Sequence, residues 1–422
     1  MEIDRDATCV IAGGGPAGLF CGFLLARAGL RTTVIEKHGD FLRDFRGDTI
    51  HPSTLQVMDE LGLLDEFLRL EHQDIRYAEG DIGERRVRIA DFTHLPVRHK
   101  RLVFMPQWDF LDFIAGKARR LANFRLLMNT QALAPIRENG RTVGLRVMDA
   151  DGARREIRAG ALVIAADGRD SRLREQAGLR VTELGAPMDV MWFRLDHRAD
   201  EDHAVLGRIE RGQALVMLYR GDYWQCALII RKGTADAVRR DGLDAFRARV
   251  ARLAGRDDAA ELTGWDDVKL LTVSVDRLRD WHASGLLCIG DAAHAMSPIG
   301  GVGINLAIQD AVAAANILHA PLRRGRVETG DLARVQRRRA FPTWATQKLQ
   351  TTIQDRVIDP ILDGAMPRVA WPIRLMQAWP WLQRLPARAI GLGFRPEHVH
   401  SPDLAGERPP ASSPAGPPSP RG

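Results

Sequence analysis

Apolar positions near the start of the chain change from one period to another within a few residues. The apolar run 9–12 predicts a buried strand, which ends at a cluster of glycines. An apolar helical run at 19–25 follows, and Gly29 ends it. A second strand is predicted at 32–35, directly before Glu36. This order of strand, glycine turn, helix, strand and acid is typical of a dinucleotide-binding βαβ unit.

The glycine turn of this unit has the spacing G-x-G-x-x-G. Its residues are Gly13, Gly14, Gly15, Pro16, Ala17 and Gly18. Gly13 permits the tight turn, Gly15 lets the backbone approach a pyrophosphate, and Gly18 lets the helix pack closely on the strand. The helix N-terminus offers N–H groups and a positive dipole end to the phosphates. An ordinary glycine turn is the alternative, and it is disfavoured because strand, helix and acid are all in register.

The acid that closes the unit indicates which dinucleotide binds. Glu36 lies 23 residues after Gly13, with Lys37 beside it, and is placed to accept hydrogen bonds from the adenosine ribose. A carboxylate at this place repels a 2′-phosphate, so FAD or NAD is favoured over NADP.

A second region of the chain alternates with period two and predicts a separate, mostly antiparallel sheet. Its strand-length segments are 190–196, 214–220, 223–231 and 268–275, and a helical insert occupies 235–255. The α/β pattern then resumes with a strand at 285–289 and a long helix at 304–318. We therefore predict an α/β protein whose Rossmann-type domain is assembled from three segments, with an inserted sheet and a helical C-terminal segment.

This pattern divides the chain into four parts. The Rossmann-type, cofactor-binding domain comprises 1–74, 105–185 and 276–345, and the substrate domain comprises 75–104 and 186–275. A helical segment covers 346–400. The tail 401–422 is rich in Pro, Ser and Gly and is expected to be disordered.

Charge and cysteine content change this picture little. The 422 residues carry a net charge of +6, but the arginines are spread among acids without the basic stripe that nucleic-acid binding requires. The four cysteines stand alone in apolar contexts, which is typical of reduced core residues and predicts a cytoplasmic protein. No signal peptide and no transmembrane segment are expected, and no metal site is predicted.

Two further motifs follow later strands, at Asp167-Gly168 and Gly290-Asp291. Together with the glycine turn they resemble the single-component (group A) FAD-dependent aromatic hydroxylases, which have the para-hydroxybenzoate hydroxylase fold. The resemblance covers about residues 5–345 and is weakest over 186–275. It implies a non-covalently bound FAD.

The resemblance also implies roles for single residues. Asp291 would bind a ribityl hydroxyl of FAD, and Gln107 would contact the same chain. Asp167 would serve the cofactor indirectly, unless it only closes a turn. Arg46 would contact the cofactor, unless it is a surface residue, and Arg174 is either the cationic end of its motif or a solvated helix charge.

The segment after Asp291 resembles the one that wraps the isoalloxazine ring. Pro298 would lie beside the flavin C4a, where oxygen adds, and the helix after Gly300 would direct its positive end at the ring. The contacts expected here are Gly290, Gly301, Val302, Gly303, Ile304 and Asn305. His294 is expected to be structural or near the substrate channel rather than a base.

The implied reaction uses NAD(P)H as a transient co-substrate and O2. A flavin C4a-hydroperoxide would hydroxylate a phenol-like or quinone-precursor ring. The chain has no second G-x-G-x-x-G, so the nicotinamide has no Rossmann site of its own. The alternatives are an FAD oxidoreductase that inserts no oxygen, similar to prenyl-chain reductases, and a flavin-bound regulator.

Two regions leave alternatives open. Alternation puts Leu215, Met217 and Tyr219 on one face of the inserted sheet and Val216, Leu218 and Arg220 on the other, and the sequence does not decide which face meets the flavin. Tyr219 is one candidate for contact with the substrate. The other polar candidates are Arg194, Arg220 and Gln225.

The segment 360–398, rich in Trp and Pro, is the second such region. It packs over the FAD domain, or it meets a membrane interface through Trp371 and Trp379. The second alternative would point to a lipophilic substrate. The oligomeric state does not follow from the sequence.

Overall fold

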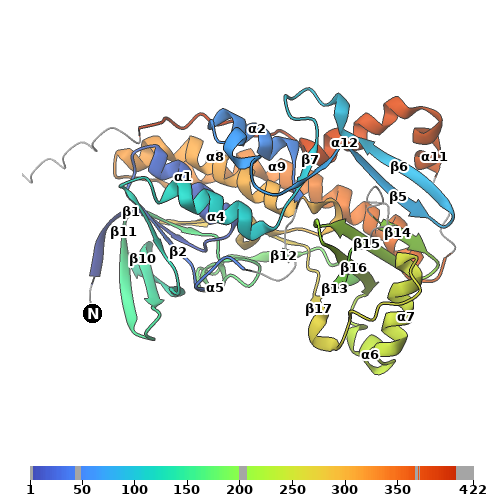
Figure 1. The fold of residues 1–422 in the computed structure, drawn as a ribbon. Helices are drawn as coiled ribbons and strands as arrows, with labels where there is room; N and C mark the ends of the chain where they lie inside the picture. Colours follow the sequence, from blue (N-terminus) through green and yellow to red (C-terminus); the bar gives the residue numbers. More distant parts are fainter. Residues whose placement is uncertain (1–2, 43–48, 199–206, 366–368, 370, 405–422) are drawn as a thin grey trace, which may run out of the picture.

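A parallel sheet forms the base of the cofactor-binding half of the molecule (Figure 1). The computed structural model describes residues 3–42, 49–198, 207–365, 369 and 371–404. The parallel strands lie in the order β20 (Leu286–Cys288), β11 (Arg154–Ala165), β1 (Ile3–Ala12), β2 (Thr32–Ile35) and β8 (Phe124–Leu127). Three antiparallel strands extend this sheet: β19 (His282–Ala283), β9 (Gln131–Glu138) and β10 (Arg141–Met148). Strands from three distant parts of the sequence therefore meet in one sheet.

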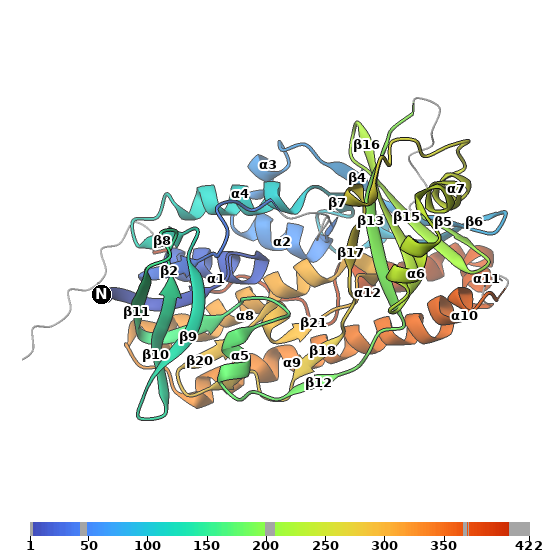
Figure 2. The same cartoon turned by 90° about the horizontal axis from the view of Figure 1, so that it is seen from below.

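Helices cover one face of this sheet. The covering helices are α1 (Pro16–Arg27), α4 (Gln107–Ala118) and α8 (Gly303–Arg323), and α9 (Thr329–Ile353) lies along α8 (Figures 1 and 2). Gly22 brings α1 close to the sheet, because a Cβ there would lie 2.5 Å from the Val34 side chain. The stretch Ile299–Arg323 is the one described helix long and apolar enough to cross a membrane, but 78% of it is buried inside the protein. Core packing accounts for this apolar run, and the absence of a transmembrane segment stays a prediction.

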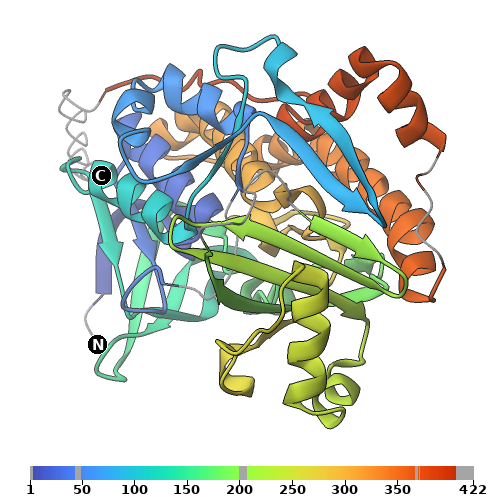
Figure 3. The same cartoon turned by 45° about the vertical axis from the view of Figure 1, so that its right-hand side comes forward.

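The inserted sheet has seven strands and lies beside the first (Figure 3). Its order is β17 (Lys269–Leu271), β13 (Met188–Asp196), β16 (Tyr223–Arg231), β15 (Gln213–Tyr219), β14 (Gly207–Glu210), β5 (Tyr77–Ile82) and β6 (Arg85–Asp91). All neighbours are antiparallel except β14 and β5. Helices α6 (Ala235–Arg240) and α7 (Leu243–Ala254) cover one face. The α/β architecture with an inserted, mostly antiparallel sheet is confirmed.

One predicted strand is shorter than expected. The run 268–275 forms only the three-residue β17, because the Val273 N–H leaves the ladder and donates to Asp189 Oδ1 at 3.0 Å. Asp189 also accepts from Lys232 Nζ at 3.0 Å and from the Gly233 N–H at 2.9 Å. A buried carboxylate thus replaces the strand pairing.

Short elements join the two large sheets. One small sheet contains β3 (Thr49–Ile50), β7 (Leu102–Phe104) and β4 (Gln73–Ile75), and another contains β12 (Val181–Glu183), β18 (Asp276–Leu278) and β21 (His294–Ala295). Helices α2 (Pro52–Glu60), α3 (Leu64–Phe67) and α5 (Arg172–Gln176) lie in the connections, with the short turn η1 (Phe92–His94) after β6.

The C-terminal part crosses the molecule twice. After α9 come η5 (Gln354–Ile358), α10 (Asp359–Leu362), α11 (Trp371–Ala378), η6 (Pro380–Gln383) and α12 (Arg384–Gly391). Helices α11 and α12 lie on β6 and η1 (Figure 1), and the end of α12 also contacts the cofactor-binding domain, where the Ile390 carbonyl lies 2.7 Å from His51 Nδ1. Residues 392–404 return along α8 to α1, where the Leu404 N–H donates to the Arg27 carbonyl at 2.8 Å. The expectation of disorder from 401 onward was therefore wrong for 401–404, while 405–422 lie outside the described residues.

Candidate active site

The glycine turn between β1 and α1 has the geometry that a pyrophosphate needs. A Cβ on Gly13 (φ +107°) would lie 2.1 Å from the Ala166 carbonyl oxygen, and one on Gly18 would lie 2.0 Å from the Gly13 oxygen. At Gly15 a Cβ would meet no atom within 4 Å. Gly13 and Gly18 therefore serve close packing, whereas Gly15 faces open space in front of the helix N-terminus.

The carboxylate at the end of β2 is held against this turn. Glu36 is 7% exposed, and its Oε2 accepts the Gly14 N–H at 2.8 Å while Oε1 accepts the His38 N–H at 3.1 Å. Lys37 points its side chain to solvent. The position of Glu36 fits a ribose acceptor, because carboxylate oxygens accept several hydrogen bonds at once.

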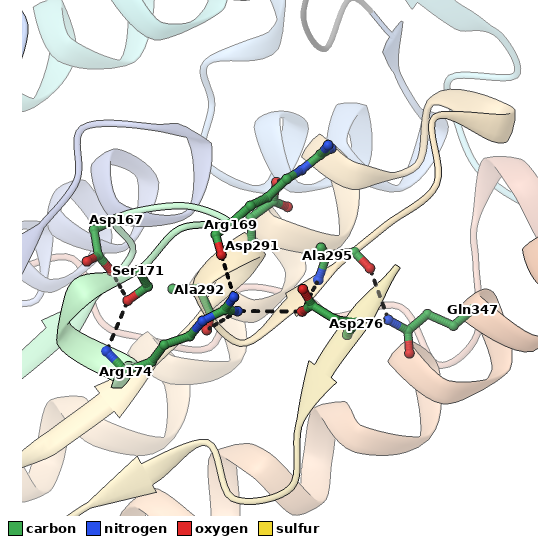
Figure 4. A network of polar contacts seen from close by, with 9 residues as sticks. All are labelled: Asp167, Arg169, Ser171, Arg174, Asp276, Asp291, Ala292, Ala295 and Gln347. Carbon is green, nitrogen blue, oxygen red and sulfur yellow. Dashed lines mark hydrogen bonds and ion pairs between the residues drawn. The ribbon is translucent and has the colours of Figure 1, made fainter. Parts of the chain in front are cut away.

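The Asp167 motif forms a local network rather than an open charged group (Figure 4). Asp167 Oδ1 accepts from Ser171 Oγ at 2.6 Å, and Ser171 Oγ accepts the Arg174 N–H at 3.1 Å and so caps α5. Burial raises the pKa of Asp167. This arrangement fits an indirect role of Asp167, and it shapes the turn that Gly13 touches.

Arg174 is not a solvated helix charge, and its role as the cationic end of its motif stays a prediction. Its guanidinium contacts the Arg169 carbonyl and lies 3.5 Å from Asp276 Oδ1, with a side chain 11% exposed (Figure 4). Arg169 in turn reaches Asp291, with Nε 3.0 Å from Oδ2. Arg174 therefore supports the backbone that carries Arg169.

The third motif lies directly against the first. Gly290 (φ +60°) starts the turn that carries Asp291, and a Cβ on Gly290 would lie 2.7 Å from the Ala17 side chain. The Asp291 side chain is about one third exposed and forms an ion pair with Arg169. Residues 273 positions apart thus meet where α1 begins.

The segment from Pro298 to Asn305 is anchored to β3. Gly300 and Gly301 have φ of +78° and +61°, and a Cβ on Gly301 would lie 2.7 Å from Thr49 Oγ1. Asn305 Nδ2 donates to the Thr49 carbonyl at 2.9 Å, and Asn305 Oδ1 accepts the His51 N–H at 2.8 Å. Pro298 is partly buried at the start of this turn.

The N-terminus of α8 lies within this segment. Val302 precedes the helix and provides no side-chain hydrogen bond to it. Its first residues are Gly303, Ile304 and Asn305. Their N–H groups are a donor set for the negative charge of a reduced flavin. Gln107 is the first residue of α4 and is partly buried, while Arg46 lies outside the described residues.

The inserted sheet turns its second face toward the cofactor-binding half. Leu215, Met217 and Tyr219 pack in the cluster under α6 and α7, where the Tyr219 ring lies 4.9 Å from His197. The expectation that Tyr219 contacts substrate is therefore corrected, because alternation turns it away. Leu218 packs instead with Phe104 and its neighbours on the opposite face.

Arg220 and Gln225 lie on the face of the inserted sheet opposite to Tyr219. The Arg220 guanidinium carbon lies 5.9 Å from the centre of the Phe104 ring, and Phe104 pairs with Thr49 beside Gly301. Arg220 Nε donates to Gln225 Oε1 at 3.1 Å. Gln225 is 4% exposed, and its buried Nε2 has no hydrogen-bond partner among the described residues. Arg194, which pairs with Gln225 across the strands, lies on the same face but is exposed over the Tyr223 ring, so Arg220 and Gln225 are the partly buried and buried polar candidates there.

A buried charge network behind the Gly290 turn was missed by sequence reasoning. Asp310 on α8 accepts from His294 Nε2 at 2.6 Å, from Arg339 Nε at 2.9 Å and from the Gly290 N–H at 3.1 Å. Arg339 Nη1 also lies 3.3 Å from Glu397 Oε1. Asp310 is an isolated charge in the apolar helix α8, which is a signal that could have found it, whereas Arg339 lies in a run of three arginines on α9 that gives no such signal. His294 is structural, as expected.

Comparison with known proteins decides the family. A family model described as an FAD binding domain matches residues 6–348. The chain is also 32% identical over 360 residues to 6-methylpretetramide 4-monooxygenase from Streptomyces rimosus, covering 83% of this chain and 84% of that relative. The chain belongs to the FAD-dependent monooxygenase family. It is thus an oxidoreductase, and its relatives include monooxygenases of aromatic compounds.

More distant family members cover less of the chain. Dialkyldecalin synthase from Streptomyces rugosporus is 28% identical over 321 residues, covering 72% of this chain and 63% of that relative. Pentachlorophenol 4-monooxygenase from Sphingobium chlorophenolicum is 24% identical over 316 residues, with 72% and 57% coverage. The chain thus spans less than two thirds of these two relatives.

A solved structure shows the same fold. The p-nitrophenol 4-monooxygenase from Pseudomonas putida DLL-E4 superposes with a TM-score of 0.72 at 20% identity, covering 92% of this chain and 98% of that one. The three motifs that carry the resemblance to the group A hydroxylases converge at the start of α1. The residues present therefore fit FAD, with open space at Gly15 and an acceptor at Glu36.

Proposed function

We propose that the protein hydroxylates a phenol-like or quinone-precursor aromatic compound, with NAD(P)H as transient electron donor and O2 as oxidant. The main observation in support of this proposal is that Gly290 packs against Ala17, which places the Asp291 turn next to the glycine turn expected to bind the pyrophosphate. Bound FAD would accept the hydride of NAD(P)H and activate O2. One oxygen atom enters the ring as hydroxyl, and the other leaves as water.

The protein's own residues would bind FAD and orient it. Gly13, Gly15 and Glu36 would hold the adenosine diphosphate part of FAD, and Asp291 would accept from the ribityl chain. The α8 N-terminus would stabilise negative charge on the reduced ring. The apolar cluster around Phe104 and Leu218 would keep water from the reaction.

Substrate orientation would come from the second face of the inserted sheet. A phenol reacts more readily as phenolate, and the Arg220 guanidinium would favour that form. The buried Nε2 of Gln225 would donate to the same oxygen. The relatives' names include pentachlorophenol and 6-methylpretetramide, which supports a ring substrate and leaves its size open.

The test is to purify the protein with FAD and follow NADH and NADPH oxidation under 18O2 with a panel of phenols. Oxidation stimulated by a phenol, with label in the product, is the expected result. The second candidate function is that of an FAD protein that inserts no oxygen. One relative supports it, since dialkyldecalin synthase is named as a synthase and not as a monooxygenase. Product without label, or turnover unaffected by any ring compound, would favour that candidate.

A further inference from the structure

The C-terminal helices expose an unusual amount of apolar surface. Trp371, Trp379, Trp381 and Leu385 are 74%, 54%, 60% and 61% exposed. Eleven large apolar side chains are exposed among the described residues, and these four lie within fifteen positions of the sequence. Such a concentration marks an interaction surface, because scattered exposed residues are normal but a gathered set is not.

The charge of the same segment has a single sign. Arg374, Arg384 and Arg388 are exposed, and the sequence has no acidic residue between Asp363 and Glu397. The neighbouring hairpin, 77–91, has four acids and three arginines and so adds one net negative charge, and its Arg86 and Arg88 are paired with Asp81 and Glu79. We call the exposed side chains of 371–388 the Trp–Arg face.

The helices that carry the Trp–Arg face are fixed to the protein. Gln377 Nε2 donates to the Arg88 carbonyl at 2.7 Å and holds α11 on β6. Ala387 and Leu392 pack inward with Phe92. The outer side therefore stays exposed while the inner side is part of the core, as in an amphipathic element that lies in an interface.

We infer that the Trp–Arg face binds the surface of an anionic lipid bilayer. Tryptophan side chains prefer the headgroup boundary, and arginines gain from the negative surface potential of anionic lipids. Exposed tryptophans and exposed arginines occur together on the segment 371–388, which is fixed to the protein. The occupant thus combines an apolar layer with a layer of negative charge.

Two other occupants fit less well. A second copy joined by a two-fold axis would bring the three arginines of each copy toward each other, which repels because the face holds no acid. The remaining sequence, 405–422, carries two arginines and one acid, so its net charge does not complement the three arginines of the face.

The inner side of the same segment reaches the candidate active site. The Ile390 carbonyl contacts His51 Nδ1 at 2.7 Å, and the His51 N–H is bound by Asn305 in the flavin-wrapping segment. Binding to a bilayer would place the side of the candidate active site formed by α12 next to apolar compounds dissolved in the membrane. The proposal concerns binding to lipid and does not depend on the hydroxylation reaction.

The test is co-sedimentation of the purified full-length protein, with FAD, on vesicles of phosphatidylcholine alone or with about 30% phosphatidylglycerol. We expect binding to the anionic vesicles that falls when salt is raised from about 0.1 M to about 0.5 M. W371S/W381S should bind at least about tenfold less, and R374Q/R384Q about 25-fold less, near fivefold per arginine.

Matched controls lie elsewhere on the surface. Trp344 on α9 is 48% exposed, and Arg326 is exposed beside Glu328, so W344S and R326Q should bind as wild type. FAD content and circular dichroism check that each variant folds. Equal sedimentation with both vesicle types, no sedimentation, or full binding by W371S/W381S would overturn the proposal. A dimer in light scattering that W371S/W381S converts to monomer would overturn it in favour of a second copy.

Discussion

At the scale of single residues, the glycines of the first turn have two different functions: some permit close packing in the fold, and one leaves space for the cofactor. Gly13 and Gly18 are enclosed by backbone, so a side chain there strikes the main chain. Gly15 has an ordinary φ of −72° and open space in front of it. Glycine is therefore required at positions 13 and 18 for the protein to fold, whereas at position 15 it is required only for the cofactor to bind.

Gly15→Val should leave the apo protein folded and weaken FAD binding about tenfold or more, because the new side chain enters the pyrophosphate space. Fluorescence titration with FAD and thermal unfolding of the apo protein measure the two effects. Gly13→Ala is the contrasting variant, with an expected loss of about 2–4 kcal/mol in the free energy of unfolding. Equal stability losses in both variants would contradict this assignment.

Gln225→Leu should raise the KM for the aromatic substrate about tenfold and leave FAD binding unchanged. The reason is the loss of a buried donor that has no partner within the described chain. Tyr219→Phe is the matched control, since Tyr219 lies on the opposite face of the sheet and should keep the wild-type KM. Steady-state oxidation of NAD(P)H at varied substrate decides between them.

At the scale of elements, the sequence predicted those parts that repeat a local pattern. The βαβ unit and the run 223–231 follow from periodicity, and the family resemblance from three motifs. The face of the inserted sheet could not be predicted, because alternation gives two faces and only tertiary packing under α7 selects one. The same holds for Asp310, whose partners come from distant parts of the chain.

The network of Asp310 links α8, α9 and the returning C-terminal chain. Burial alone would raise the pKa of Asp310, but hydrogen-bonded His294 and the Arg339 guanidinium hold it below its usual value. Asp310→Asn should therefore cost about 3 kcal/mol in the free energy of unfolding, because Arg339 loses a buried partner. Urea unfolding measures this cost.

The control for Asp310→Asn is Arg326→Ala, which removes an exposed ion pair with Glu328 and should cost less than about 0.5 kcal/mol. Weaker FAD binding in Asp310→Asn but not in the control is also expected, because the amide has one acceptor oxygen where the carboxylate serves the Gly290 N–H, His294 and Arg339 with two. Stability equal to wild type would refute the network's role.

His51 ties β3 to α12 and makes stability depend on pH. Burial lowers the pKa of His51 from 6.5 to about 4, although the hydrogen bond to Ile390 acts in the opposite direction. Between these values the unfolded chain binds the proton and the folded chain does not. Stability is therefore full above about pH 6.5 and falls by up to about 3 kcal/mol toward pH 4.

Chemical unfolding at several pH values should show this slope in the wild type and a smaller slope in His51→Gln. His400→Gln, at an exposed histidine, should keep the wild-type slope. A His51→Gln slope equal to that of the wild type would assign the pH dependence to other groups.

At the scale of the whole molecule, the cofactor site is assembled from segments that share no continuous stretch of chain. Ligand binding should therefore stabilise the entire α/β domain, by about 2.7 kcal/mol when FAD is present at a hundred times its Kd. Thermal unfolding with FAD and with FMN tests this. FMN lacks the adenosine that Glu36 would bind, so it should raise the Tm less. Equal shifts would argue against the adenosine end.

This discontinuity has a consequence for synthesis on the ribosome. Strand β1 pairs with β2 early, but its other neighbour, β11, is made about 150 residues later, and the Gly290 turn later still. Flavin therefore cannot act as a template for the nascent chain until about three quarters of it has emerged. The edge of β1 that β11 covers in the folded protein stays unpaired during that time, so the early chain is the form most exposed to aggregation.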